Sequence, residues 1–255
     1  MTRLLRALTV FAGLVLVWQA TVTIFELPRF ILPGPWTVAI ALVDNAGILA
    51  RHAGQTLAEI LLGLLAGTAL GCLSALTMAW FRPARRWLMP VLVVSQAVPV
   101  FALAPMLVLW FGFGMASKVA MATLIIYFPV TAAFLDGLMR AEPGWLDLAR
   151  TLGADRRAVL RHIRLPAALP GLASGLRVAT AVAPIGAIVG EWVGAGAGLG
   201  YLMLHANART QQPLMFAALF VLAVIAVALW FAVDAGLRRA LPWQPDSHPA
   251  DDPAP

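Results

Sequence analysis

Residues 143–170 combine charged, apolar and conformationally special side chains in a pattern that suits binding better than catalysis. The run Asp147-Leu148-Ala149-Arg150-Thr151-Leu152-Gly153 is followed, after nine intervening residues, by Ile163-Arg164-Leu165-Pro166. A carboxylate and several guanidinium groups can form charge-assisted hydrogen bonds, and the leucines between them offer apolar contact surface. We therefore expect this segment to present an amphipathic surface to another molecule.

The local pattern predicts two short helices joined at a glycine corner. Pro143 can occupy the first turn of a helix without losing a hydrogen bond, and Gly153 is expected to stop that helix where the backbone needs a positive φ. Asp155 can start the second helix, which reaches Pro166. Such a pair could rest on anionic membrane lipid, which its arginines would favour. The apolar side chains between the charges favour a groove in a soluble protein instead.

The sequence offers little that could support catalysis or hold a cofactor. A nucleophile–base set or a metal site needs several suitable residues together, and the histidines and the cysteine are isolated from one another. These residues are His52, His162, His205, His248 and Cys72. The one lysine, Lys118, lies outside any phosphate-binding loop, and the glycine-rich run 194–200 reads as a flexible loop or re-entrant turn. We predict no catalytic residue, no metal site and no cofactor bound by this chain.

The composition is that of a membrane protein. Charged residues make up 12% of the chain and hydrophobic residues 61%, whereas roughly 25% of a soluble domain is charged. Several apolar runs reach the ~20 residues that a helix needs to cross a bilayer. We predict an all-α polytopic membrane protein with about six transmembrane helices. The expected spans are residues 7–25, 56–81, 87–111, 119–138, 169–192 and 214–233.

The distribution of arginines predicts the orientation of these spans. Short loops with an excess of Lys and Arg stay in the cytoplasm. With the N-terminus inside, the cytoplasmic segments hold Arg3, Arg6, Arg82, Arg85, Arg86, Arg140, Arg150, Arg156, Arg157, Arg161, Arg164, Arg238 and Arg239. The other side holds Arg29, Arg51, Lys118 and Arg209. We expect both termini in the cytoplasm, and we expect no nucleic-acid partner because the basic residues are spread over separate loops and termini.

The chain is predicted to form one membrane domain with extensions. Residues 1–53 are expected to hold an uncleaved N-terminal transmembrane helix and a periplasmic loop, with a surface helix within 36–49. Residues 54–238 form the transmembrane domain proper. Residues 239–255, rich in Pro and Asp, are predicted to be a disordered cytoplasmic tail.

Polar residues inside the spans are candidates for function because they are expensive in a bilayer. The expected pathway-lining residues are Ser95, Gln96, Pro99 and Glu191, and a kink at the proline would free backbone carbonyls toward a cavity. Helix–helix hydrogen bonding is the alternative for the first two. For the glutamate, a gate or loop anchor is weighed against a simple interfacial residue. Arg177 is expected either to reach the cytoplasmic interface or to pair with Asp136 or Asp234. Gly63, Gly67 and Gly71 are expected to allow close packing within the chain.

The ordered motifs resemble those of binding-protein-dependent ABC transporter permeases. That family carries Glu-Ala-Ala, then Gly after three residues, then Ile-x-Leu-Pro after nine more, and residues 147–166 keep this spacing. Asp147 replaces the Glu and Leu148 replaces the first Ala, which preserves a carboxylate and an apolar residue. Further matches, to the nitrate/sulfonate/taurine branch, are Leu32-Pro33-Gly34-Pro35, Gln55-Thr56-Leu57, Gln96-Ala97-Val98-Pro99, Leu107-Val108-Leu109-Trp110-Phe111-Gly112 and Gly190-Glu191-Trp192.

The resemblance implies one permease subunit of a type I ABC importer in the cell inner membrane. The implied partners are a second permease copy in a homodimer, two ABC ATPase subunits that hydrolyse ATP with Mg²⁺, a periplasmic or lipid-anchored substrate-binding protein, and membrane lipid. The resemblance assigns ATPase coupling to Asp147, Leu148, Ala149, Gly153, Ile163, Leu165 and Pro166.

The substrate is expected to be a small polar organic molecule. Residues 145–150 and 204–209 look most like permeases for the hydroxymethylpyrimidine precursor of thiamine, and a sulfonate, taurine or nitrate is the alternative.

Two other classes of protein are weighed against an ABC permease. A proton-coupled secondary carrier would need a buried relay of ionisable groups, for which only Arg177 and Glu191 are candidates. A membrane enzyme would need catalytic clusters that the sequence does not offer.

Overall fold

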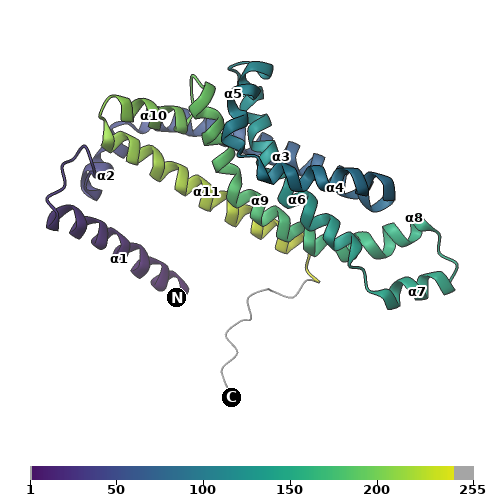
Figure 1. The fold of residues 1–255 in the computed structure, drawn as a ribbon. Coiled ribbons are helices and arrows are strands. Elements are labelled where there is room, and N and C mark those ends of the chain that lie inside the picture. The colour runs from purple at the N-terminus through teal and green to yellow at the C-terminus, as the bar shows by residue number, and fades with distance from the viewer. Residues whose placement is uncertain (1, 244–255) are drawn as a thin grey trace.

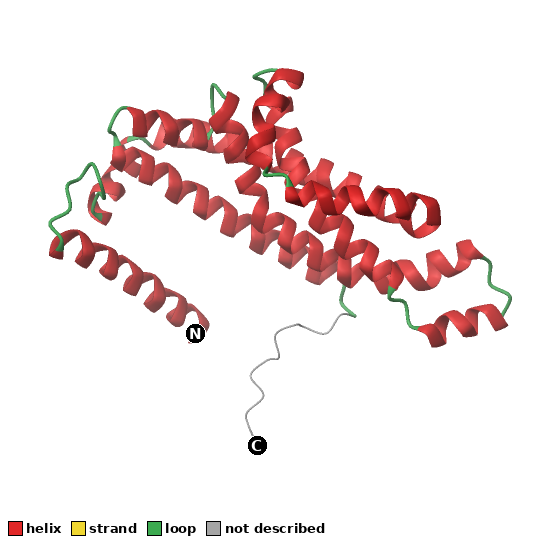
Figure 2. Ribbon diagram, viewed as in Figure 1, coloured by secondary structure: helices red, strands yellow, loops and turns green. Residues whose placement is uncertain are grey.

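The described part of this computed structural model, residues 2–243, is built from helices alone (Figures 1 and 2). The helices are α1 (Thr2–Ile24), α2 (Pro35–Asp44), α3 (Ala46–Trp80), α4 (Arg82–Ala97), α5 (Val100–Phe111), α6 (Met115–Met139), α7 (Pro143–Thr151), α8 (Arg156–Val159), the π-helical turn η1 (Leu160–Arg164), α9 (Leu165–Gly194), α10 (Leu199–Ala208) and α11 (Gln212–Ala240). Helices satisfy their own backbone hydrogen bonds, which a bilayer interior requires. The predicted all-α class is confirmed.

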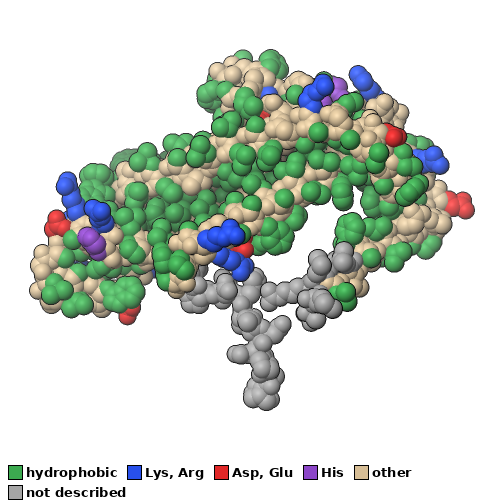
Figure 3. All heavy atoms as spheres, turned by 180° about the vertical axis from the view of Figure 1, so that it is seen from behind, with side chains coloured by type: hydrophobic (Ala, Val, Ile, Leu, Met, Phe, Trp, Pro, Cys, Tyr) green, Lys and Arg blue, Asp and Glu red, His purple; other side chains and the backbone are tan. Residues whose placement is uncertain are grey.

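The long helices correspond to the predicted spans. Four helical segments are long and apolar enough to cross a membrane: Ala46–Trp80, Met115–Met139, Arg156–Gly194 and Gln212–Ala240. The first predicted span is α1, whose apolar part, Thr9–Ile24, is shorter. Hydrophobic side chains cover most of the face drawn in Figure 3. Most of the predicted tail, 239–255, lies outside the described residues, and α11 continues to Ala240.

The third predicted span, 87–111, is not one helix. It is divided into α4 and α5, which meet at an angle of 104°. The break follows from Pro99, because a proline disfavours helical geometry in the residue before it. Val98 accordingly has φ −83° and ψ 119°, and α5 restarts at Val100. The prediction of a kink at the proline is confirmed, although the bend is a complete interruption of the helix.

The core forms where α6 lies between α3 and α9. Ala122 of α6 faces Gly63 of α3 and Gly186 of α9, and a Cβ on Gly186 would lie 2.7 Å from the Ala122 Cα. Farther along α3, Gly67 packs on Ile126 and Gly71 on Val130. Small residues let helix backbones approach closely. The predicted role of Gly63, Gly67 and Gly71 in internal packing is confirmed.

An ion pair on the buried carboxylate of Asp234 joins α9 to α11. The Arg177 Nε donates to Asp234 Oδ1 at 2.7 Å, and the Arg238 Nε donates to Asp234 Oδ2 at 2.9 Å. Both oxygens of this buried carboxylate therefore have partners, although the Arg238 side chain itself is exposed. Of the alternatives set out for Arg177, the structure selects pairing with Asp234, while Asp136 pairs with Arg140.

Helix α1 lies apart from the other long helices (Figure 1). Trp18 of α1 makes an aromatic contact with Phe216 of α11, and their ring centroids lie 6.0 Å apart. Large apolar side chains on several sides of α1 are exposed in this single chain, including Phe11, Leu14 and Val17. Helix α2 begins with Pro35 at its first turn and ends at Asp44, so the surface helix expected within 36–49 is shorter than predicted and passes directly into α3.

The tight contact between α3 and α6 predicts the effect of a single methyl group. We expect Gly63→Ala to destabilise the fold by about 1–3 kcal/mol, because the new Cβ would overlap the Ala122 Cβ. Gly54→Ala, on the same helix with open space around its Cβ, should leave the thermal midpoint of the purified protein unchanged or raise it slightly, because alanine favours a helix. Adding Ala122→Gly to Gly63→Ala should cost less stability than the sum of the two single changes, and strict additivity would show that the two positions do not meet.

Candidate functional site

Residues 143–166 form a hairpin that projects beyond the long helices (Figure 1). Helix α7 has Pro143 in its first turn, and it ends at Thr151. Gly153 has φ +71°, its amide donates to the Arg150 carbonyl, and the Ala154 amide donates to the Ala149 carbonyl. These two bonds form the Schellman motif that closes a helix at a glycine. The predicted helix stop at Gly153 is confirmed.

The second half of the hairpin is continuous with α9. Asp155 caps α8, since its Oδ1 accepts from the Ala158 amide at 2.7 Å, as its predicted place at a helix start requires. The helix does not end near Pro166, contrary to expectation. The wide turn η1 carries a bond from the Leu165 amide to the Leu160 carbonyl, and Pro166 enters in the first turn of α9, where its missing N–H does little harm.

The side chains of the hairpin divide into an exposed set and a packed set. Trp145, Leu148 and Leu152 recur along one side of α7 and are more than half exposed, Leu152 at 76%. Asp147 is also exposed and pairs with Arg150 at 2.7 Å. Ala149 is buried, and Ile163 and Leu165 are half-buried. The predicted residues thus lie within one hairpin and its junction with α9, and no part of the chain that the structure describes covers the apolar stripe.

One contact ties the hairpin to the end of α3. The Arg156 guanidinium donates to the Trp80 carbonyl at 2.7 Å and lies 5.0 Å from the centre of the Trp80 ring. The last carbonyls of a helix lack helical partners, so a donor from another element is favourable there. The guanidinium also gains from the face of the indole. We call this contact the Arg156–Trp80 joint.

At the opposite end of α3, a buried polar cluster holds the start of α10. Helix α10 begins after Gly198, which has no side chain to cap the first amides. Other helices supply the acceptors. The Gly198 amide donates to His52 Nδ1 at 2.9 Å, and the Leu199 amide donates to Thr56 Oγ1 at 2.8 Å. The Gly200 amide donates to Glu191 Oε2.

The same acceptors are linked to one another. The Thr56 hydroxyl donates to Glu191 Oε1 at 2.6 Å, so the carboxylate joins α3, α9 and α10. Glu191 is 1% exposed, and a carboxylate is favourable at a helix N-terminus because of the positive end of the helix dipole. Glu59, one turn from Thr56, contacts Glu191 and accepts from Gln55 at 3.0 Å. We call His52, Thr56, Glu59 and Glu191 the α10 clamp.

Two glycines make this arrangement possible. Gly198 has φ +115°, a region that side chains other than glycine rarely adopt, and a Cβ there would overlap the Glu191 carboxyl group. At Gly200 a Cβ would lie 2.9 Å from Glu191 Oε2. The last part of the glycine-rich run 194–200 is therefore the start of an anchored helix. The expected turn occupies residues 195–198 between α9 and α10, while Leu199 and Gly200 already belong to α10 and their amides are hydrogen-bonded.

The four expected pathway residues lie in two places. Ser95 is at the end of α4, where its hydroxyl bonds to the Leu92 carbonyl at 2.7 Å. Gln96 and Pro99 are exposed at the break between α4 and α5. Glu191 is separate from these three, within the α10 clamp. The sequence analysis assigned no site role to His52, Thr56 or Glu59, although their spacing places them on one face of α3.

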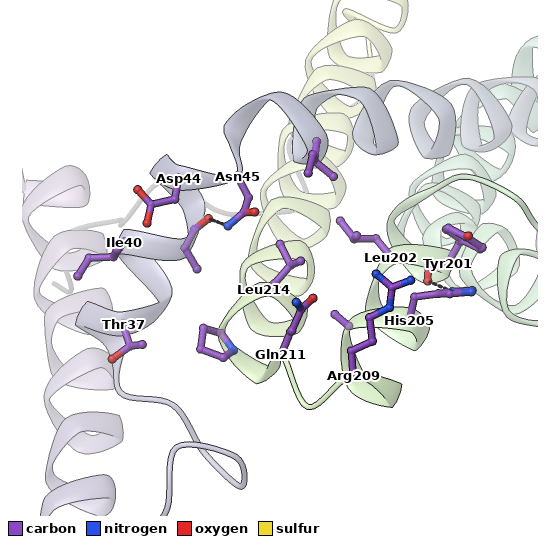
Figure 4. A pocket seen from close by; sticks show the side chains of 14 residues that line it. Thr37, Ile40, Asp44, Asn45, Tyr201, Leu202, His205, Arg209, Gln211 and Leu214 are labelled. Atoms are coloured by element: carbon purple, nitrogen blue, oxygen red, sulfur yellow. Dashed lines mark hydrogen bonds between the residues drawn. The ribbon is translucent and has the colours of Figure 1, made fainter.

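A pocket of about 680 Å³ opens beside α10, between α2 and the start of α11 (Figure 4). Charged and polar side chains line it, including Asp44, Asn45, His205 and Arg209. Tyr201 connects it to the α10 clamp, because its ring centroid lies 3.9 Å from that of His205 and 5.9 Å from that of His52. Neighbouring rings therefore connect this pocket to His52 of the α10 clamp.

Comparison with known proteins agrees with this architecture. Residues 67–242 match the family described as the binding-protein-dependent transport system inner membrane component. A probable ABC transporter permease protein of Haemophilus influenzae is 53% identical over 237 residues, which cover 93% of this chain and 97% of the relative. The formylaminopyrimidine transport permease protein ThiX of Halalkalibacterium halodurans is 36% identical, covering 92% and 94%. The riboflavin transport system permease protein RibX of Chloroflexus aurantiacus is also 36% identical, covering 89% and 85%.

The fold is that of solved importer permeases. A chain of the MetNI methionine ABC transporter, in an inward-facing conformation, superposes with a TM-score of 0.67 at 19% identity, covering 77% of this chain and 97% of that one. At this identity the likeness concerns the fold alone. Together with the family match, it identifies a multi-pass membrane protein whose ATP is hydrolysed by a separate subunit. The chain therefore belongs to the family of binding-protein-dependent transport system inner membrane components, as the permease subunit of a type I ABC importer.

Proposed function

We propose that this permease carries a neutral heteroaromatic solute, with a hydroxymethylpyrimidine-type thiamine precursor as first choice. The observation that carries the proposal is that two relatives at 36% identity are named for formylaminopyrimidine and riboflavin, both ring compounds. The charges inside the helices agree. Arg177 is neutralised by Asp234, and Lys118 donates to the carbonyls of Phe113 and Gly114 at 2.9 and 2.8 Å. The Arg177 guanidinium is therefore paired, and the Lys118 ammonium, which keeps its charge, is 3% exposed and held by two carbonyls, so neither group is presented to a sulfonate or nitrate ion.

Uptake into vesicles tests this substrate. The complete transporter, with its ATPase and binding protein, is expected to move labelled hydroxymethylpyrimidine across the vesicle membrane when ATP is supplied on the side that carries the ATPase. A tenfold excess of taurine or nitrate should not compete. Accumulation of taurine or nitrate with no pyrimidine uptake would contradict the substrate and leave the ABC permease assignment intact. Uptake that follows a proton gradient without ATP would favour a secondary carrier.

The proposed assembly places the hairpin of α7, α8 and η1 in the cytoplasm. The arginines at this end support that orientation, and both termini then lie inside as well. Two ABC ATPase subunits hold ATP and Mg²⁺, and the exposed stripe of Trp145, Leu148 and Leu152 seats in a groove on one of them. Asp147 supplies a negative charge at this contact, and Gly153 sets the angle between the two helices of the hairpin. Ile163, Leu165 and Pro166 connect it to α9.

The opposite end, with α10 and its pocket, faces the periplasm in this proposal. The substrate-binding protein docks there, where Asp44, His205 and Arg209 offer polar contacts. A second copy of the chain completes the pathway in a homodimer, and the exposed apolar side chains of α1 support a partner for that helix. Ser95, Gln96 and Pro99 line the pathway between the copies, and residues 54–238 form the permease domain.

We further propose that α3 transmits movement between the two ends. The Arg156–Trp80 joint holds one end of the helix, and Thr56 in the α10 clamp lies at the other. At 1.5 Å per residue these points are roughly 36 Å apart, about the thickness of a bilayer core. Because α3 is continuous from Ala46 to Trp80, a displacement of the hairpin by the ATPase reaches α10 without intermediate joints.

The corner of the hairpin provides a test of coupling. Gly153→Val is expected to reduce ATP-driven uptake strongly while the chain still inserts, because a branched side chain at φ +71° is strained by about 1–2 kcal/mol and re-aims both helices. No atom lies within 4 Å of a Cβ at Gly153, so a clash is not involved. Gly236→Val, also in open space but within α11, is the control. Equal uptake by the two variants would contradict a coupling role for the corner.

The α10 clamp predicts a second transport phenotype. Thr56→Val removes a hydroxyl that serves both the Leu199 amide and Glu191, so two buried polar groups lose a partner. We expect the amount of substrate moved per ATP hydrolysed to fall at least about fivefold. Thr131→Val is matched in burial, but its hydroxyl bonds only to the Tyr127 carbonyl within α6. If both valine variants transported alike, the clamp would have no part in transport.

A further inference from the structure

An arginine-lined cavity of about 740 Å³ lies between the hairpin and the turn that joins α3 to α4. Five arginines line it: Arg82, Arg85, Arg150, Arg156 and Arg164. None of its lining residues is acidic. The remaining walls are mainly apolar, and they come from the ends of α3 and α6, from α7, and from α8 and η1. The cavity therefore combines concentrated positive charge with an apolar floor.

Several of these guanidinium groups lack an anionic partner within the described chain. Arg150 pairs with Asp147, and Arg156 is held in the Arg156–Trp80 joint. Arg85 contacts the Met139 sulfur at 3.5 Å, a weak acceptor, and the Arg164 Nε is buried without a hydrogen-bond partner. A buried donor without an acceptor is costly. An anion in the cavity would satisfy these groups, and guanidinium groups match phosphate geometry especially well.

A second, apolar groove continues from this cavity. It has a volume of about 980 Å³ and runs between α4 and α6 along Met89, Pro90, Val93, Val94, Ala132 and Leu135. Arg86 and Asp136 also line it, and the Asp136 carboxylate is paired with Arg140. Arg85 and Met139 line both spaces, so the arginine cavity opens onto the groove. A charged compartment followed by an apolar one matches a molecule with an anionic head and a hydrocarbon chain.

We propose that this composite site binds an anionic phospholipid, with the phosphate among Arg82, Arg85 and Arg164 and one acyl chain in the groove. Basic pockets between membrane helices are suited to such headgroups. A free phosphate ion would leave the groove unfilled. A carboxylate of the ATPase is less suitable, because the exposed stripe of α7 carries Trp145, Leu148 and Leu152, whereas Leu146 and Arg150 on another side line the cavity. The lipid packs against the hairpin and the Arg156–Trp80 joint.

Native mass spectrometry of the full chain in mild detergent tests the site. Phosphatidylglycerol is offered against phosphatidylcholine at equal concentration, and glycerol 3-phosphate is then added to the phosphatidylglycerol complex as a competing headgroup probe. We expect the unmodified chain to retain phosphatidylglycerol. Retention should be weaker by a factor of about ten or more in Arg82→Gln/Arg85→Gln, since two charge-assisted contacts are removed. Arg157→Gln/Arg161→Gln removes the same charge from exposed positions on α8 and η1 outside the cavity, and it should retain the lipid.

Four results would overturn the proposal. Equal loss in the two double variants would mean that binding follows overall charge, and equal retention would mean that Arg82 and Arg85 do not hold the lipid. Full competition by glycerol 3-phosphate would mean a site for a free anion. Displacement of the lipid by the ATPase, with weaker ATPase binding in Arg82→Gln/Arg85→Gln, would assign the cavity to that subunit. A phosphatidylglycerol with a photoreactive acyl chain needs no variant: labelling within residues 89–94 and 132–139 supports the site, and labelling elsewhere contradicts it.

Discussion

The first amides of α10 have to be satisfied inside the membrane protein, and much of the structure depends on how this is done. No water is available in the apolar interior to bond them. His52 and Thr56 from α3 and Glu191 from α9 supply the acceptors, so one short helix is fastened to two long ones. Gly198 and Gly200 are required because any side chain there would displace the Glu191 carboxyl group. The position of α10 therefore cannot change without disturbing α3 or α9.

Helix α3 contacts other elements at both of its ends. Near Trp80 it meets the hairpin through Arg156, and near Thr56 it meets α10. Between them, Gly63, Gly67 and Gly71 hold it tightly against α6. Under the proposed mechanism, the ATPase moves the hairpin, and α3 carries that movement to the helix beside the periplasmic pocket. The Arg177–Asp234 pair, which ties α9 to α11, keeps the neighbouring helices together during such a movement.

The features that sequence could predict are those determined by near neighbours in the chain. Pro99 interrupts a helix through its own ring, and Gly153 adopts a positive φ within one Schellman motif, so both were foreseeable. Long apolar runs likewise identify spans. The α10 clamp was not foreseen as a whole, because His52 and Thr56 are 135 to 146 positions from the groups that they bond in α9 and at the start of α10. These groups meet only after the helices have packed.

The misjudged segments have the same cause. A glycine-rich run suggests mobility when it is read alone, yet residues 198–200 are fixed by side chains from distant helices. Pro166 suggests a helix boundary, but the wide turn η1 directly before it allows the helix to continue into α9. For Arg177, the sequence offered two carboxylate partners on equal terms, and only the packing of α9 on α11 selects Asp234.

Hydrogen–deuterium exchange at the Leu199 and Gly200 amides tests most directly whether α3 connects the two ends. The complete transporter would be compared with and without a non-hydrolysable ATP analogue, in the unmodified form and as Arg156→Gln, with Arg157→Gln as control. The account predicts faster exchange at these amides when the analogue binds, and loss of that response in Arg156→Gln alone, because the Arg156–Trp80 joint is removed. An undiminished response in Arg156→Gln would contradict it.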